Sequence, residues 1–275
     1  MTNPIGNRQE FGSPLDFMVD QKPRMTMAMV RRAVSDREAM LAFQRVVQSD
    51  RSDQVVFHEG SVRLIDETGR IVPLHDFMCA AELTELGRQI DCLALDLALH
   101  ALAEDASIRL SVTMSARSIG YPAWMRALRD GIGRNANIAE RLILEIGESS
   151  AMALPETVGP FMRELQSHGV NFALDDFGSG FMSVRYLRDF CFDMIKIDGR
   201  FIRDIAQQRD NQVLARALQS IAHHFDMCTV AKAVETAEDA AFLADLGIDC
   251  LQGGHFGGPT IVPPWRSSRS LAHQG

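Results

Sequence analysis

The chain has 275 residues, a length that fits two average domains or one α/β barrel of about 250 residues. Apolar residues make up 46% and charged residues 23%, proportions that are typical of a soluble globular protein and argue against a largely disordered one. The 28 Lys and Arg residues against 36 Asp and Glu residues leave a net charge of −8, which argues against broad DNA or RNA binding.

The sequence indicates neither a membrane protein nor a secreted one. No apolar stretch reaches the roughly 20 residues that a membrane-spanning helix needs, and the N-terminal residues lack the basic and then apolar layout of a secretory signal. The cysteines are widely spaced and form no C-x-x-C motif, so neither a disulfide framework nor a zinc site is expected. We therefore expect a cytoplasmic protein with five reduced cysteines, namely Cys79, Cys92, Cys191, Cys228 and Cys250.

The folded part of the chain is expected to be one domain, residues 25–265. Residues 1–24 contain several prolines and glycines and little periodicity, which predicts a flexible N-terminal tail. Residues 266–275 have the same character and predict a C-terminal tail. Between the tails we find no linker and no low-complexity segment.

Short β-type runs alternate with amphipathic segments along this domain. Apolar residues recur at three- and four-residue spacing over 83–97 and 158–165, which predicts helices there. Thr236 followed by Asp239 predicts the start of a later helix, and Gly247 predicts its end. The β-type runs are expected at residues 41–48, 54–65, 109–115, 141–147, 171–176, 193–198, 228–234 and 249–254.

Eight strands interleaved mainly with helices predict an α/β fold in which the strands close into a barrel. Only about six residues separate the first two runs, too few for the crossover helix that parallel strands need. This first pair is therefore expected to be antiparallel.

Acidic residues lie near the C-terminal ends of several runs, where β/α barrels place their active sites. They are Glu59, Glu145, Asp175, Asp176, Asp198 and Glu235, and two lysines, Lys196 and Lys232, hold equivalent positions. So many carboxylates at one mouth do not all stay ionised unless cations compensate them. The compensating positive charge could come from a divalent metal ion, from the two lysines, or from both. The alternative interpretations are a structural ion-pair network and solvated loop residues.

Four longer segments follow one another in a characteristic order: LILEIGES at 142–149, DDFGSGF at 175–181, MIKIDGRFI at 194–202 and CLQGGHFGGP at 250–259. They resemble segments of the EAL family, the bacterial phosphodiesterases and receptors for cyclic di-GMP. The resemblance spans roughly residues 25–265 and implies a modified TIM-type (β/α) barrel with one antiparallel strand. The short first connection agrees with that fold.

The resemblance also implies roles for individual residues. A divalent metal would be held by Glu59, Glu145 and Asp175, with Thr113 standing where the family has an asparagine, and Glu148 would lie just outside these ligands. Catalytic positions are implied for Asp176, Lys196, Lys232 and Glu235, and contacts with the dinucleotide for Gln44, Arg63, Asp198 and Gln252.

Two motifs depart from the family pattern. The EALLR signature reads Glu59-Gly60-Ser61-Val62-Arg63, and the AEGVE strand reads Ala231-Lys232-Ala233-Val234-Glu235. Lys232 thus replaces a glutamate implicated in binding a second metal and activating water, and an ammonium repels a metal ion. The hydroxyl of Thr113 is a weaker oxygen ligand than an amide carbonyl.

These departures predict a degenerate, catalytically inactive EAL-type signalling module that acts through a protein partner as a regulatory or cyclic di-GMP-responsive protein. The alternative is an active or weak phosphodiesterase that produces pGpG. Mg or Mn is the cofactor implied by the family, and we expect it to be absent or weakly bound here. A homodimer formed through residues 183–190, which follow the DDFG-type loop, is a further prediction.

Overall fold

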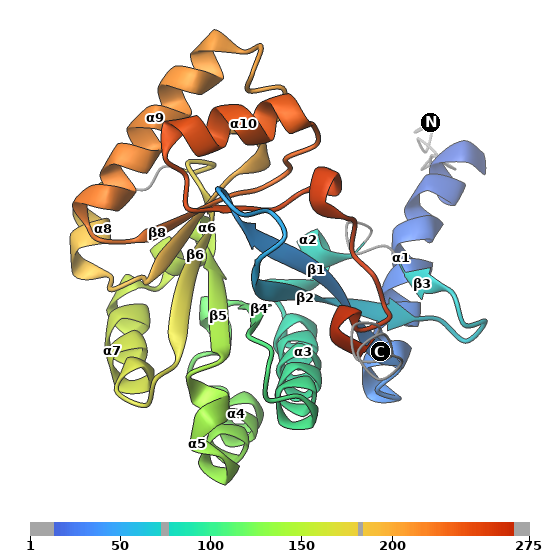
Figure 1. The fold of residues 1–275 in the computed structure, drawn as a ribbon. Helices are drawn as coiled ribbons and strands as arrows, with labels where there is room; N and C mark the ends of the chain where they lie inside the picture. Colours follow the sequence, from blue (N-terminus) through green and yellow to red (C-terminus); the bar gives the residue numbers. More distant parts are fainter. Residues whose placement is uncertain (1–13, 73–76, 181–183, 267–275) are drawn as a thin grey trace, which may run out of the picture.

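The structure is a computed structural model, and it describes residues 14–72, 77–180 and 184–266. Within these residues, eight strands form a closed barrel with helices packed around it (Figure 1). The barrel strands are β1 (Ala39–Gln48), β2 (Val55–Ile65), β4 (Leu110–Met114), β5 (Leu142–Gly147), β6 (Asn171–Phe177), β7 (Met194–Ile197), β8 (Cys228–Ala231) and β9 (Cys250–Leu251). A short strand, β3 (Ile71–Val72), extends β2 beyond the ring.

The strand order confirms the predicted barrel. The neighbours run β1-β9-β8-β7-β6-β5-β4-β2, and the pairing of β1 with β2 closes the ring. β1 is antiparallel to both of its neighbours, whereas the other pairs in the ring are parallel. The antiparallel first pair is therefore confirmed.

Helices pack around the barrel, with the first helix before the first strand and the later helices between successive strands. They are α1 (Pro14–Ser35), α2 (Met78–Ala81), α3 (Glu85–Glu104), α4 (Pro122–Arg134), α5 (Ala136–Ala139), α6 (Glu148–Ala153), α7 (Pro155–Gln166), α8 (Val184–Asp189), α9 (Arg209–His224) and α10 (Ala237–Leu246). Among the described residues, none of these helices combines the length and the apolar character that a membrane crossing requires.

Several local expectations need correction. Residues 14–24, predicted to belong to a flexible tail, lie within α1, which begins at Pro14, a position where a missing N–H costs little. Strand β8 is shorter than predicted, since Ala233 adopts φ 58° and the extended run ends after Ala231, and β9 is shorter than predicted as well. Strand β3 was not expected, because two residues carry no periodicity. Residues 1–13 and 267–275 lie outside the described residues, so the outer tail boundaries stay predictions.

The barrel interior has an apolar layer and a polar layer. The apolar layer lies toward the N-terminal ends of the strands and comprises Val46, Phe57, Ile143, Ala173, Val230 and Cys250. Residues two positions further along a strand face the same side. Glu145 therefore follows Ile143 inward and Asp175 follows Ala173, so the polar side chains gather at the C-terminal mouth.

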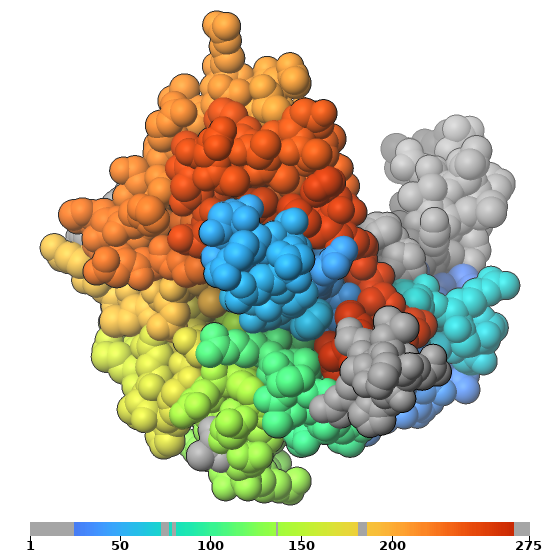
Figure 2. Space-filling view, viewed as in Figure 1, coloured from blue at the N-terminus to red at the C-terminus, as the bar shows by residue number. Residues whose placement is uncertain are grey.

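The outer face of β1 is covered partly by the C-terminal segment, which compensates for the missing crossover helix. Phe43 and Thr260 exchange backbone hydrogen bonds, and the Trp265 ring lies edge-on to Phe43 and His58, with centroids 4.7 and 5.1 Å away. Figure 2 shows the blue segment around the β1–β2 turn lying against the red C-terminal part of the chain. Segments far apart in sequence thus seal the seam where the barrel closes.

Candidate functional site

Lys196 lies at the centre of the polar layer, where β7 projects its side chain into the barrel. The ammonium is fully buried and donates to Glu59 Oε2 at 2.5 Å and to Glu145 Oε1 at 2.8 Å. Burial alone would lower the pKa of Lys196, but the carboxylates of Glu145 and Glu59 outweigh it and raise the pKa. The lysine is therefore a permanent cation between two acids.

The two glutamates that share Lys196 differ in their electrostatics. Burial opposes ionisation of Glu59, but Lys196 and a hydrogen bond from Gln252 (2.7 Å) prevail and hold the pKa of Glu59 well below its usual range. For Glu145 burial prevails, and its pKa is raised to about 7. Glu145 Oε2 is buried and has no hydrogen-bond partner. One carboxylate of the pair is thus firmly ionised and the other titrates near neutrality.

Lys232 forms a second ion-pair cluster at the mouth. Its Nζ lies 2.7 Å from Asp175 Oδ1 and 2.7 Å from Asp176 Oδ1. The burial of Lys232 would lower its pKa, but Asp175 and Asp176 raise it above the usual value despite the repulsion from Lys196. The ammonium therefore remains charged and neutralises one of the two aspartates.

A bulge in β6 allows two consecutive aspartates to reach one lysine. Successive side chains of a regular strand point to opposite faces. Between Leu174 and Phe177 the register with β7 shifts, and Asp176 adopts φ 53°. A bulge of this kind re-aims a side chain, so the Asp176 carboxylate turns back toward Lys232.

Two cavities flank these clusters. One, of about 450 Å³, is lined by residues that include Gln44, Glu59, Lys232, Glu235 and Gln252. The other, of about 280 Å³, lies on the far side of Asp175 and Asp176. Most of the residues that the sequence indicated therefore converge on one open mouth.

Within the larger cavity, hydrogen bonds position the two glutamines. Gln252 Nε2 donates to Gln44 Oε1 at 3.2 Å as well as to Glu59, and Gln44 Nε2 donates to the carbonyl of Gly257 at 3.1 Å. Asp198 also lines this cavity, and its Oδ1 accepts from the Arg200 N–H at 2.7 Å, which caps the turn at 199–201.

Three predicted residues lie elsewhere around the mouth. Thr113 is exposed, lines the smaller cavity and pairs with Glu145 across the β4–β5 ladder. Glu148 accepts from the Gly178 N–H at 2.8 Å and so supports the loop that follows β6. Arg63 donates to the Val62 carbonyl at 3.0 Å and lines neither cavity.

Sequence reasoning missed Asp91 and Arg203. Asp91 lines the smaller cavity, where its Oδ2 accepts from Ser118 Oγ at 2.6 Å and from the Ser115 N–H at 2.9 Å. Burial raises the pKa of Asp91 to about 7. Arg203 lines the larger cavity and adds a cation there. Asp91 could have been noticed in the sequence, because it interrupts an apolar helical pattern. Nothing in the sequence distinguishes Arg203 from a surface arginine.

Comparison with known proteins agrees with this geometry. The family described as EAL domain matches residues 27–259. The chain belongs to the EAL domain family. Cyclic di-GMP phosphodiesterase PdeB of Shewanella oneidensis is 28% identical over 238 residues, which cover 84% of this chain and 27% of that protein. The bifunctional diguanylate cyclase/cyclic di-GMP phosphodiesterase MucR of Pseudomonas aeruginosa is 28% identical and covers 84% of this chain and 34% of its own length.

Solved EAL structures superpose on most of the chain. The PaMucR phosphodiesterase in its c-di-GMP complex matches with a TM-score of 0.75 and 25% identity, covering 88% of this chain and 99% of that one. The FimX EAL domain of Pseudomonas aeruginosa bound to c-di-GMP matches with a TM-score of 0.77 and 25% identity, covering 86% and 97%. The chain spans about a third or less of the length of the curated relatives PdeB and MucR.

The residues at this EAL mouth fit a two-metal centre poorly. Glu59, Glu145 and Asp175 keep the oxygen donors of one position, and the unpartnered Oε2 of Glu145 is a donor atom of the right kind. At the second position, however, the Lys232 ammonium already lies against Asp175 and Asp176. Among the described residues, no group of three or more His, Cys, Asp or Glu side chains is arranged to hold a metal ion.

Proposed function

We propose that this EAL domain is a hydrolytically silent signalling module that binds cyclic di-GMP and passes its state to a protein partner. The observation that carries the proposal is the position of Lys232, 2.7 Å from both aspartates of the DDFG-type loop. Two lysines fixed in the chain supply the positive charge that diffusible metal would otherwise supply to the mouth.

Electrostatics support the hydrolytic silence. Phosphodiester hydrolysis by two metals needs both ions about 4 Å apart, to generate hydroxide and to stabilise the leaving oxygen. A single positive charge about 4 Å from a divalent ion is repelled by roughly 8 kcal/mol at an effective dielectric constant of 20. Asp175 and Asp176 each contact Lys232 already, so the second ion would have to displace that ammonium.

The larger cavity supports binding of the dinucleotide. Cyclic di-GMP carries two phosphates and two guanines, which need cations and amide or carboxylate groups. The cavity presents Lys232, Arg200 and Arg203 together with Gln44 and Asp198. The PaMucR and FimX structures, which share the fold, are described as complexes with c-di-GMP.

The alternative remains a metal-dependent phosphodiesterase that produces pGpG. The unpartnered Oε2 of Glu145 favours it, because a buried carboxylate oxygen without a hydrogen-bond donor is an available metal ligand. The partner protein and the homodimer stay predictions. Of residues 183–190, Ser183 lies outside the described residues.

Incubation with cyclic di-GMP and Mn²⁺ tests the choice. We expect no pGpG above the protein-free blank, together with a calorimetric binding isotherm for cyclic di-GMP in the presence of EDTA. Multiple turnovers per protein molecule would overturn the silent module, and a flat isotherm would overturn the receptor role.

A charge-restoring variant tests the cause. Lys232→Glu combined with Thr113→Asn should raise Mn²⁺ affinity at least tenfold, because the repelling cation becomes an oxygen ligand. The matched control combines Thr113→Asn with Arg216→Glu, the same reversal of charge at an exposed position on α9. Equal Mn²⁺ affinity in both variants would show that Lys232 is not what excludes the metal.

A further inference from the structure

Three sulfur-bearing side chains lie on one face of neighbouring strands, at the end of the barrel opposite the mouth. Cys228 on β8 and Cys250 on β9 face the apolar interior layer, and Met194 on β7 packs against the same layer. Met194 and Cys228 are direct neighbours across the β7–β8 ladder. Cys250 pairs with Val230, two residues after Cys228. Three consecutive strands therefore each contribute one sulfur-bearing side chain to one place.

The two thiols lie on the same face of the neighbouring strands β8 and β9. A hydrogen bond between them lowers the pKa of Cys228 and, together with burial, raises the pKa of Cys250. Cys250 is buried and Cys228 is partly exposed, and neither is in a disulfide. The pair thus differs from Cys191, which is exposed.

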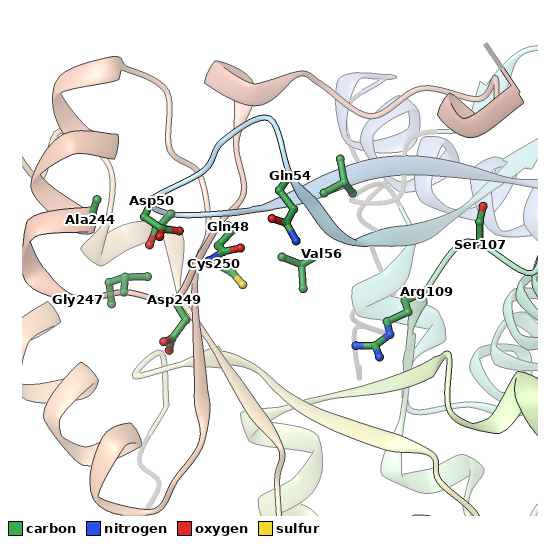
Figure 3. A pocket seen from close by; sticks show the side chains of 13 residues that line it. Gln48, Asp50, Gln54, Val56, Ser107, Arg109, Ala244, Gly247, Asp249 and Cys250 are labelled. Atoms are coloured by element: carbon green, nitrogen blue, oxygen red, sulfur yellow. The ribbon is translucent and has the colours of Figure 1, made fainter. Parts of the chain in front are cut away.

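A cavity connects this sulfur cluster with solvent. It has a volume of about 640 Å³ and is lined by Cys250, Gln48, Arg109, Asp249 and neighbouring residues. Figure 3 shows Cys250 among these side chains, beside Gln48 and Asp249, with Arg109 coming from the segment just before β4. Asp249 is engaged by Thr229, whose N–H and hydroxyl donate to it at 2.8 and 2.7 Å. The cavity gives an ion a path to Cys250.

We propose that Cys228, Cys250 and Met194 form a binding site for a soft monovalent cation of the Cu(I) type. Thiolate and thioether sulfurs are the ligands that select Cu(I) over harder ions. Since no set of three His, Cys, Asp or Glu ligands is present among the described residues, Zn²⁺ or Mg²⁺ would lack a complete coordination shell. Two thiolates and one thioether suffice for Cu(I).

Strand geometry favours a bridging metal over a disulfide. Two residues offset by one inward-facing position on neighbouring strands have Cα atoms about 8 Å apart, from a rise of about 3.3 Å per residue and a strand spacing of about 4.8 Å. A disulfide needs Cα atoms roughly 4.4–6.8 Å apart. A metal ion between the sulfurs spans the larger gap while the ladder stays intact.

Binding of Cu(I) exchanges two thiol protons for one copper ion. The S–H bonds of Cys228 and Cys250 break, their two thiolates and the Met194 thioether form three Cu–S bonds, and the two protons leave through the cavity. The copper stays Cu(I), so no oxidant or reductant takes part. The product carries one net negative charge, and the cavity that reaches Cys250 also contains the cation Arg109.

Anaerobic competition with the chromophoric chelator bicinchoninate tests the site on the full chain. Wild-type protein should withdraw one equivalent of Cu(I) from the chelator. The Cys228→Ser/Cys250→Ser double variant should bind at least 100-fold more weakly, and Met194→Leu should lose roughly tenfold, because leucine keeps the volume but not the sulfur. X-ray absorption should show only sulfur neighbours around the copper.

Cys191→Ser is the matched control and should keep the wild-type capacity, since this thiol lies outside the cluster. Circular dichroism melts, together with Cys→Ala versions of the double variant, separate loss of ligands from loss of fold. Failure of wild-type protein to withdraw copper would overturn the proposal, and so would full capacity in a folded double variant. Cyclic di-GMP binding at the other end of the barrel is measured separately, so the two proposals fail independently.

Discussion

Ala233 holds a backbone conformation that suits glycine better than alanine. Its φ of 58° lies in the left-handed region, which costs a residue with a Cβ about 1–2 kcal/mol. The methyl group of Ala233 also leaves no room for a side chain at position 199, because a Cβ built on Gly199 would lie 2.8 Å from the Ala233 Cβ. The strained residue directly follows Lys232, at the position where the family's AEGVE strand has a glycine.

Ala233→Gly should therefore raise the free energy of unfolding by about 0.5–1 kcal/mol, once the greater entropy of glycine in the unfolded chain is subtracted. Urea denaturation measures the change. Ala241→Gly, the same substitution at an exposed position inside α10, should lower the free energy of unfolding by about as much. A destabilised Ala233→Gly protein would mean that the left-handed conformation carries no strain.

Asp91 makes stability depend on pH near neutrality. Burial raises its pKa to about 7 in the folded protein, against an ordinary value of 3.8. Between about pH 4 and pH 7 the folded chain therefore holds more protons than the unfolded chain. The free energy of unfolding falls as the pH rises through this window and levels off above it. Glu145, with a pKa raised to about 7, acts with the same sign.

Asp91→Asn removes one of these two contributions while keeping an oxygen that accepts from Ser118 and Ser115. Urea denaturation at pH 5, 6, 7 and 8 should show a slope that is shallower by about 1 kcal/mol per pH unit below pH 7. An unchanged slope would show that the carboxyl group at position 91 is ionised throughout this range.

At the scale of the element, Arg141 connects the end of α3 with the loop before β4 and with α5. Its buried guanidinium donates to the carbonyls of Leu102, Asp105 and Ile108 at 2.8–3.0 Å, and to Asn137 on α5. The last carbonyls of a helix have no partner within the helix. A single side chain from the residue just before β5 thus supplies hydrogen-bond donors to carbonyls at the C-terminal end of α3 and in the loop that leads into β4.

Arg141→Ala should lower the free energy of unfolding by about 2–4 kcal/mol, because several buried carbonyls lose a charged donor at once. Urea or thermal denaturation measures the loss. Arg134→Ala, at an exposed position in the last turn of α4, should cost less than about 0.5 kcal/mol. Equal losses in the two variants would contradict a buried role for Arg141.

At the scale of the whole molecule, the barrel was predictable because its signals are long and regular. The eight β-type runs, the antiparallel first pair and the capped helix α10 follow from periodicity, connection length and the Thr236–Gly247 pattern. Clustering of Glu59, Glu145 and Lys196 also follows, since strand ends of one barrel meet at one mouth.

Other features depend on geometry that the sequence does not encode locally. Alternation alone would send the Asp176 side chain away from Asp175, and only the β6 bulge brings both to Lys232. By alternation, Arg63 should face inward like Glu59. It lies near the end of the long strand β2, however, and its guanidinium donates to the Val62 carbonyl and lines neither cavity. Asp91 reaches the mouth because α3 packs back along the barrel, which is a tertiary contact.

The two ammonium groups at the mouth have a consequence for how the protein meets its surroundings. Because Lys196 and Lys232 are covalent parts of the chain, their charge is present at every protein concentration and in every buffer. A chelator such as EDTA therefore leaves the charge of these two ammonium groups unchanged.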